Sequence, residues 1–266
     1  MPSGRALLWA LALTGLACQP SSGVSVRDAA VEQPSFDVPP LDGATAGYAL
    51  SFDGVRQYAT AGDAGFLPVG GPMTIELWVN YAAATNTQDF IALRTSVANG
   101  SESGVQIGIH AGVLAVWRVF VDRVLVQAAT NPAAGTWHHV AYTFDTTTNV
   151  FYVDGVAVDS NTNPTDTHTP GSAWLGTRDG YTNLFKGQLD EVRVWAVTRS
   201  ASQIVTDMQH SSGQGETGLV AYWTFDDVGD VGRSVDLSGH GNDVTFGDGV
   251  AELMPLRVPS DIPFGS

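Results

Sequence analysis

The sequence contains a single cysteine, Cys18, among 266 residues. A disulfide within the chain is therefore excluded, and a folded domain must be stabilised by its hydrophobic core, with a metal ion as one further contribution. Lysine is also nearly absent, because Lys186 is the only one, and the formal net charge is −15. A surface of this charge repels phosphate backbones, so we expect no nucleic-acid partner.

Common catalytic signatures are missing as well. The sequence contains neither the His-Glu-x-x-His of zinc proteases nor the Gly-x-Ser-x-Gly of serine hydrolases. The neighbours His138 and His139 are no metal pair, because adjacent residues of a strand point to opposite faces. The better interpretation is that this pair supplies a hydrogen-bonded core histidine. The sequence also has no visible internal repeat.

The first 18 residues have the pattern of an export signal. Arg5 precedes an apolar run, residues 6–13, that is too short to span a bilayer, and small residues precede Cys18. Residues 1–18 resemble a bacterial lipoprotein signal, in which Cys18 is lipidated; ordinary secretion with cleavage near Cys18 is the alternative. Gln19 is not an aspartate, which in such lipoproteins implies the outer membrane. We expect a protein of the cell envelope, touching the membrane only through this anchor, or a secreted one.

The remaining chain divides by composition. Residues 19–46 are rich in Ser, Pro, Gly, Asp and Val without periodicity, which indicates a flexible tether. Strand signals then recur about every ten residues, with almost no helix, which favours two packed antiparallel sheets in one domain, residues 47–256. Residues 257–266 are predicted to be a frayed tail.

Residues 187–195 alternate in a way that predicts one β-strand. One face would hold Leu189, Glu191, Arg193 and Trp195, and the other Gln188, Asp190, Val192 and Val194. Residues 73–81 alternate in the same way and predict a half-buried strand. Ser200 as N-cap with Gln203 three residues later predicts one short helix near residues 200–209.

Four stretches carry a family resemblance. Residues 185–204, with Leu-Asp-Glu-Val-Arg-Val-Trp at their centre, resemble the signature of laminin-G-like jelly-roll domains of the concanavalin A-like lectin/glucanase superfamily. Residues 49–58, 73–79 and 137–155 fit other strands of that family in order. The resemblance covers most of residues 47–255 and implies an all-β fold, a two-sheet antiparallel jelly-roll sandwich.

A further pair of stretches, residues 218–226 and 236–242, resembles a motif pair that the family often carries ahead of its opening strand. In this chain the pair comes last. We therefore expect it to complete the same jelly roll from the C-terminal side, since too few residues remain for a second domain.

The resemblance also implies a structural calcium ion. Asp53 and Asp190 match the positions that hold it, and the backbone of Gly54 could supply a further oxygen, because calcium takes six to eight. The alternative is that Asp53 only caps the Asp-Gly turn, while Asp190 pairs with an arginine such as Arg193 or Arg56.

Sugar recognition needs aromatic faces bordered by amides, carboxylates or arginines, because a pyranose has an apolar face and a ring of hydroxyls. Two regions of the sequence have this character, a middle strand and the loop 178–183. The candidates are Trp117 and Arg118 on the strand, and Asp179, Tyr181 and Asn183 in the loop.

By resemblance, we expect a non-catalytic extracellular binding module for carbohydrate or another cell-surface polymer, acting as a monomer. The catalytic Glu-x-Asp-x-x-Glu strand of β-glucan hydrolases is absent, and Glu76 and Glu191 lie on separate strands. A protein-interaction or structural module of the envelope, with an extracellular protein as partner, remains an alternative. A glycan-degrading enzyme is the less favoured one.

Overall fold

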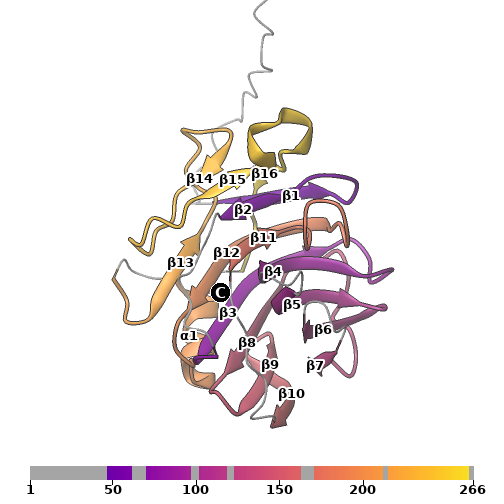
Figure 1. The fold of residues 1–266 in the computed structure, drawn as a ribbon, viewed down its shortest axis with the longest axis vertical. Helices are drawn as coiled ribbons and strands as arrows, with labels where there is room; N and C mark the ends of the chain where they lie inside the picture. The colour runs from indigo at the N-terminus through magenta and orange to yellow at the C-terminus, as the bar shows by residue number, and fades with distance from the viewer. Residues whose placement is uncertain are drawn as a thin grey trace, which may run out of the picture. The chain divides into compact units, whose positions relative to one another are not determined.

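A computed structural model describes residues 47–61, 70–96, 102–118, 123–162, 171–211 and 215–263 (Figure 1). All of them belong to one compact unit, Gly43–Ser266. The predicted signal with Cys18, the tether 19–46 and the last three residues lie outside the described residues. No helix within these ranges is long and apolar enough to cross a membrane.

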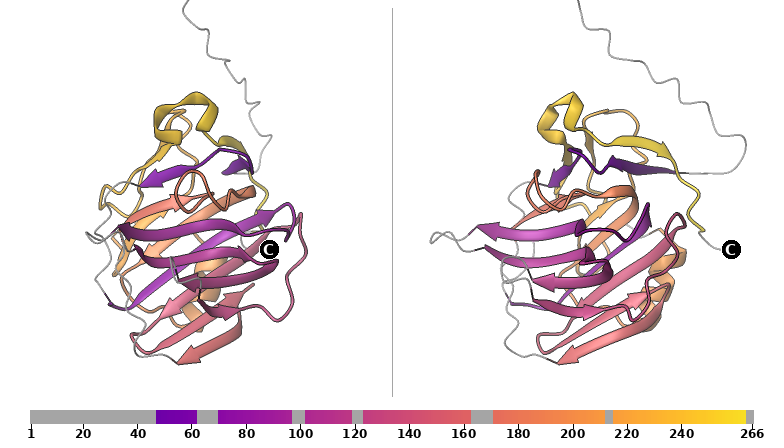
Figure 2. Two further views of the ribbon diagram at one scale, coloured as in Figure 1. Left: turned by 45° about the vertical axis from the view of Figure 1, so that its right-hand side comes forward. Right: turned by 90° about the vertical axis from the view of Figure 1, so that its right-hand side faces the viewer.

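The described strands form two antiparallel sheets of eight strands each, with their core between them (Figure 2). In pairing order, sheet A contains β10 (Val156–Thr162), β9 (Thr148–Val153), β8 (His138–Phe144), β3 (Met73–Tyr81), β12 (Lys186–Trp195), β1 (Tyr48–Asp53) and β16 (Leu256–Pro259), with β13 (Leu219–Trp223) also paired to β12. Sheet B contains β14 (Arg233–Ser234), β15 (Val244–Phe246), β2 (Ala59–Ala61), β11 (Ser172–Leu175), β4 (Gln88–Ser96), β5 (Glu102–His110), β6 (Val113–Arg118) and β7 (Val124–Gln127). The predicted jelly-roll sandwich is confirmed.

Alternate residues of each strand supply the core. Ile75 and Leu77 of β3 meet Ile107 of β5 and Val116 of β6 in a single buried cluster. Successive side chains of a strand point to opposite faces, so the residues between these positions lie on the outer faces of the two sheets.

The strict alternation predicted for β12 is wrong after Asp190. Glu191 has a φ of 49°, and the pairing of β12 with β3 shifts register between Asp190 and Arg193. Such a β-bulge adds one residue to one strand and reverses the faces beyond it. Leu189 and Val192 therefore both lie in the core, and Asp190 does not share a face with the valines.

The outer face of sheet A is covered, which the sequence did not indicate. Helix α1 (Ala201–Gln209) packs Ile204 against Ala141 of β8 and Tyr152 of β9. β3 alternates as predicted, but Glu76 on its outer side is buried as well, so the prediction of a half-buried strand is wrong. The helix itself starts as predicted, with reciprocal hydrogen bonds between Ser200 and Gln203.

The C-terminal segments complete both sheets, as expected. β13 pairs with β12 in sheet A, and β15 pairs with β2 in sheet B. Two short 3-10 turns, η1 (Gly247–Gly249) and η2 (Ala251–Leu253), then lead into β16. β16 pairs with β1 along its whole length, so the predicted boundary at residue 256 is too early, because backbone pairing continues to Pro259.

Candidate functional site

A cavity of about 260 Å³ lies on the outer face of sheet B. It is lined by Thr87, Gln106, His110, Trp117, Arg118, Arg178 and Asn183. The two regions that the sequence marked for sugar recognition, the strand with Trp117 and the loop 178–183, thus contribute to one site. We call it the sheet B cavity.

Strand register places these residues together. Val105, Ile107 and Ile109 of β5 point into the core, so Gln106 and His110 point outward. Gln106 is paired with Trp117 of β6 across the strands. The loop after β11 is fastened beside them, because the backbone N–H of Asp89 on β4 donates to the carbonyl of Asn183 at 2.9 Å.

A buried carboxyl lies beneath the cavity. Asp89 is fully buried, and its Oδ1 accepts a hydrogen bond from Gln106 Nε2 at 2.8 Å. Burial raises the pKa of Asp89 to about 8, against the opposing effects of Asn183, Arg178 and Gln106. The carboxyl is therefore mostly uncharged at neutral pH. One of the two N–H groups of the Gln106 amide is engaged below, so its carbonyl oxygen and its second N–H are the groups left for a ligand.

Trp117 lines the cavity, but the face of its indole ring is not open to solvent. Only 2% of its surface is exposed, and its ring lies 4.9 Å from that of His110, centroid to centroid. Trp117 pairs with Gln106, and His110 lies four positions after Gln106 on the same strand. The side chains of Trp117 and His110 therefore lean toward each other along the strands. A sugar would meet the edge of this aromatic pair rather than stack on a free indole face.

Asp179 and Tyr181 do not line the cavity. Asp179 Oδ1 accepts the backbone N–H groups of Tyr181 at 3.0 Å and Thr182 at 2.8 Å. Burial alone would raise the pKa of Asp179, but these hydrogen bonds lower it below its ordinary value. Asp179 therefore shapes the loop, while Tyr181, at 87% exposure, points into solvent.

Asp53, Gly54 and Asp190, the predicted calcium residues, are not brought together. Asp53 pairs with Lys186 and Leu50 with Leu189, so Asp190 lies four positions further along the strands, roughly 13 Å from Asp53. Calcium–oxygen distances are about 2.3–2.6 Å, so the three residues do not fit one calcium ion. Among the described residues, no group of three or more His, Cys, Asp or Glu is arranged to hold a metal ion.

Each of the two carboxylates has local partners instead. Asp53 Oδ1 accepts the N–H groups of Val55 at 2.8 Å and Arg56 at 3.1 Å, the turn-capping role left open as the alternative. Gly54 adopts the positive φ of 75° that this turn requires. Asp190 accepts from Ser260 Oγ and from the N–H of Glu191. The alternative arginine partner is not found, because Arg193 binds Glu191.

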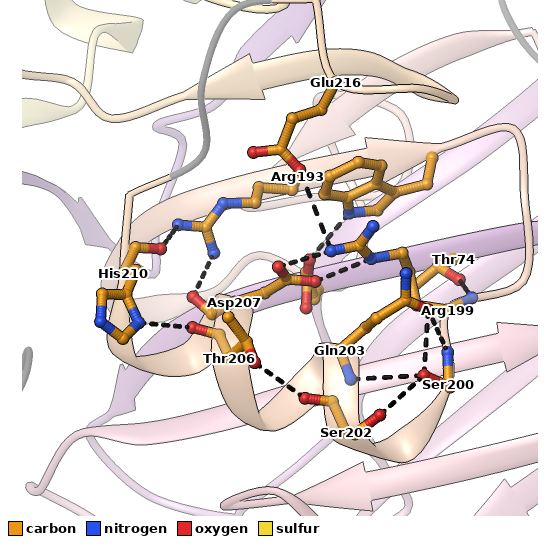
Figure 3. A network of polar contacts seen from close by, with 12 residues as sticks. Thr74, Arg193, Arg199, Ser200, Ser202, Gln203, Thr206, Asp207, His210 and Glu216 are labelled. Atoms are coloured by element: carbon orange, nitrogen blue, oxygen red, sulfur yellow. Dashed lines mark hydrogen bonds and ion pairs between the residues drawn. The ribbon is translucent and has the colours of Figure 1, made fainter.

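Sequence analysis missed an ionic network under α1, on the outer face of sheet A; Figure 3 shows the part of it around Arg193, Arg199 and Asp207. We call it the outer-face network; its members are Glu76, Glu191, Arg193, Arg199, Asp207 and Tyr222. Fully buried Arg193 donates to Glu191 and to the backbone carbonyls of Asp207, at 3.0 Å, and His210, at 2.9 Å. The signal was present in the sequence, since Glu191, Arg193 and Trp195 alternate on one face.

The network joins sheet and helix through a second arginine. Arg199 donates to both oxygens of Asp207 on α1, at 2.8 and 2.6 Å, and its guanidinium lies 3.9 Å from the centroid of Trp195. Trp195 Nε1 in turn donates to Glu76 at 2.7 Å. Burial raises the pKa of Glu76 to about 8, although Arg193 opposes the shift. Glu76 and Glu191 are thus occupied within the fold and closed to solvent.

The two neighbouring histidines point to opposite faces of their strand, as predicted. His139 is buried at 3.7 Å from Glu76, and burial lowers its pKa to about 3, so it is neutral. Neither of its ring nitrogens has a hydrogen-bond partner among the described residues, so the predicted hydrogen bond is not found. His138 lies at the surface and contacts Asp154 at 2.8 Å.

A second cavity, of about 360 Å³, lies beside the C-terminal end of α1. Its polar groups are largely engaged with one another or with neighbours. His138 contacts Asp154, and Trp137 Nε1 donates to Asp261 at 2.6 Å.

Comparison with known proteins gives a family match and fold relatives. Residues 53–205 match the family described as Concanavalin A-like lectin/glucanases superfamily. A provisionally assigned carbohydrate-binding protein from Bacteroides ovatus has a similar structure, with a TM-score of 0.63 and 20% identity over 83% of this chain. The chain spans 62% of the length of that structure. No curated protein matches the sequence.

A heptameric SAP-like pentraxin from Limulus polyphemus is a second fold relative. Its TM-score is 0.54 and its identity 15%, over 77% of this chain and 96% of that chain. At such identities the likeness extends to the fold and not to the residues of the sheet B cavity.

Proposed function

The chain belongs to the concanavalin A-like lectin/glucanases superfamily, and on this premise we propose that it is a non-catalytic module that binds carbohydrate in the sheet B cavity. The observation that carries the proposal is the convergence of two amide side chains, Gln106 and Asn183, with two guanidinium groups around one small cavity. Amides and guanidinium groups together offer the acceptors and donors that a ring of hydroxyls needs. At about 260 Å³ the cavity suits a single sugar unit.

The environment of the carboxylates supports binding without hydrolysis. Glycosidases use two carboxyl groups about 5–10 Å apart on either side of the scissile bond. Glu76 and Glu191 are buried in the outer-face network, and neither of the two cavities described above is lined by two carboxylates. We therefore expect no release of reducing ends from glycans that the protein binds.

We also propose that lipidated Cys18 anchors the protein in the cell envelope, where the tether 19–46 presents the domain to surface polymers. This proposal rests on the sequence of residues 1–46 alone. Labelling of the chain with a fatty-acid analogue tests it, since labelling that persists in Cys18→Ala would contradict it.

Asn183 offers a sharp test of carbohydrate binding. Its φ is 55°, a conformation that glycine adopts without strain, so Asn183→Gly keeps the backbone of the loop while it removes the amide together with its interaction with Asp89. Loss of one neutral hydrogen bond should weaken binding to immobilised glycans about 3- to 10-fold. Asn86→Gly is the matched control, because exposed Asn86 has a φ of 62° and does not line the cavity.

Two results would contradict the proposed function. Binding to a glycan that is insensitive to Asn183→Gly would place the site elsewhere. Capture of an envelope protein by the full chain, with no binding to any glycan tested, would favour the protein-interaction alternative.

Calcium binding stays a prediction, and we propose that it does not involve Asp53. Because Asp53 is engaged by the backbone of its own turn, we expect Asp53→Asn to leave the calcium response unchanged. The measurement is the difference in Tm between calcium and chelator for the wild-type chain and the variant. If calcium raises the Tm of the wild type but not that of Asp53→Asn, Asp53 is part of the calcium site and this expectation is wrong.

A further inference from the structure

The charge of the sheet B cavity runs against that of the protein. Asp and Glu outnumber Lys and Arg by 27 to 12 in the sequence. Among the described residues that line the cavity, Arg118 and Arg178 are cationic and none is acidic. A guanidinium at the edge of a polar cavity attracts anions most strongly where competing carboxylates are absent.

Arg178 is only loosely paired within the fold. Its Nη2 lies 3.5 Å from Asp179 Oδ2, longer than a charge-assisted hydrogen bond, and its Nε is buried without a hydrogen-bond partner among the described residues. Arg199, in contrast, holds Asp207 in a two-pronged pair at 2.8 and 2.6 Å. Charge-assisted N–H···O bonds are typically about 2.7–2.9 Å long, so Arg178 retains capacity for an external carboxylate.

The two acidic residues beside Arg178 do not replace such a ligand. Asp179 Oδ1 is occupied by backbone N–H groups of its own loop and by Thr182 Oγ1, at 2.9 Å. Asp89 is buried below Gln106, and its raised pKa of about 8 keeps it mostly uncharged at neutral pH. Arg178 therefore lines the cavity with one long ion pair, to Asp179 at 3.5 Å, opposing its positive charge.

From this geometry we propose that the sheet B cavity selects a sugar unit that carries a carboxylate, a uronic acid, which Arg178 binds with Arg118 beside it. The inference rests on the proposed carbohydrate-binding function and names its ligand class. A planar guanidinium can form two parallel hydrogen bonds to a carboxylate, while the amides of Gln106 and Asn183 contact ring hydroxyls. Neutral sugars would leave Arg178 with its long ion pair to Asp179 alone.

The test uses polymers that differ only in the charged group. Binding of the full chain is measured to polygalacturonate, alginate and hyaluronan, and to the carboxyl-reduced, neutral form of each. We expect at least one acidic polymer to bind about 10- to 100-fold more tightly than its reduced form, as loss of a charged hydrogen bond implies. The preference should diminish as salt is raised, because screening weakens the pairing.

Arg178→Gln should remove this preference while residual binding to the reduced polymer persists, which shows that the cavity is still formed. Arg56→Gln is the matched control, because exposed Arg56 lies outside the cavity and its loss changes the net charge equally. Equal binding of acidic and reduced polymers overturns the inference and leaves carbohydrate binding intact. Binding of sulfated but not carboxylated glycans also overturns it. If no polymer of either kind binds, both the inference and the proposed function are wrong.

Discussion

Replacing Arg193 by methionine is expected to destabilise the domain by about 3–5 kcal/mol, because it leaves the buried carboxylate of Glu191 without its cation. Arg193 is fully buried and donates to Glu191, and its charge also acts on Glu76. It also bonds two carbonyls at the end of α1, so the helix would lose its attachment to sheet A. For a domain of this size the loss corresponds to a fall in Tm of roughly 10 °C or more, measured by calorimetry.

Arg233→Met is the control for this variant. Half of the Arg233 side chain is exposed, and its ion pairs to Asp230 and Asp243 are 3.6 and 3.5 Å long. Exposed pairs of this kind contribute about 0–1 kcal/mol, so the control should unfold within a few degrees of the wild type. Adding Glu191→Gln to Arg193→Met should recover part of the lost stability, since it removes one stranded charge. Equal stabilities of Arg193→Met and Arg233→Met would contradict the role assigned to the network.

Asp89→Asn is expected to change how stability depends on pH. The pKa of Asp89 is raised from 3.8 to about 8 in the folded protein, so between these values the folded state holds a proton that the unfolded state has lost. The stabilising contribution of the protonated carboxyl is complete below pH 3.8 and is lost as pH rises to 8. One pKa unit corresponds to about 1.4 kcal/mol, so the wild type should lose several kcal/mol relative to Asp89→Asn across this range.

Urea unfolding at a series of pH values measures this difference. Asparagine keeps an acceptor for Gln106 Nε2, so the variant should retain the floor of the sheet B cavity. Asp145→Asn is the control of opposite sign, because hydrogen bonds from Thr148 and Thr147 lower the pKa of exposed Asp145. The wild type should be more stable than Asp145→Asn at neutral pH, and this difference should be lost only as pH falls through the acidic range. Parallel stability curves for the wild type and Asp89→Asn would show that Asp89 is ionised in the folded protein.

Local patterns in the sequence were sufficient for the fold class. Strand signals recurring about every ten residues indicated two sheets, and alternation located the strands at 73–81 and 187–195. Ser200 with Gln203 located the start of α1, because the residues that decide a helix cap lie within a few positions of one another. The family motifs were likewise contiguous. The last stretches of the chain could therefore be assigned to the same jelly roll before their partners were known.

The site residues were predictable in part. Trp117, Arg118 and Asn183 were chosen for their chemistry, and the structure places all three at one cavity. Arg178 was marked only as the first residue of the loop 178–183. Asp89 and Gln106 were not singled out, because no local pattern shows that strands β4 and β5 bring a buried carboxyl beneath an amide. Asp53 and Asp190 were linked by resemblance, but strand register separates them.

Composition and short-range periodicity by themselves determined that the chain is an acidic, disulfide-free β sandwich with one capped helix. Tertiary structure alone decided which faces are buried and which polar groups meet. A bulge at Glu191 reverses the second half of β12, and α1 closes the outer face of sheet A over charged residues. Both outcomes depend on pairings between residues far apart in the chain, where a shift of one position exchanges inside for outside.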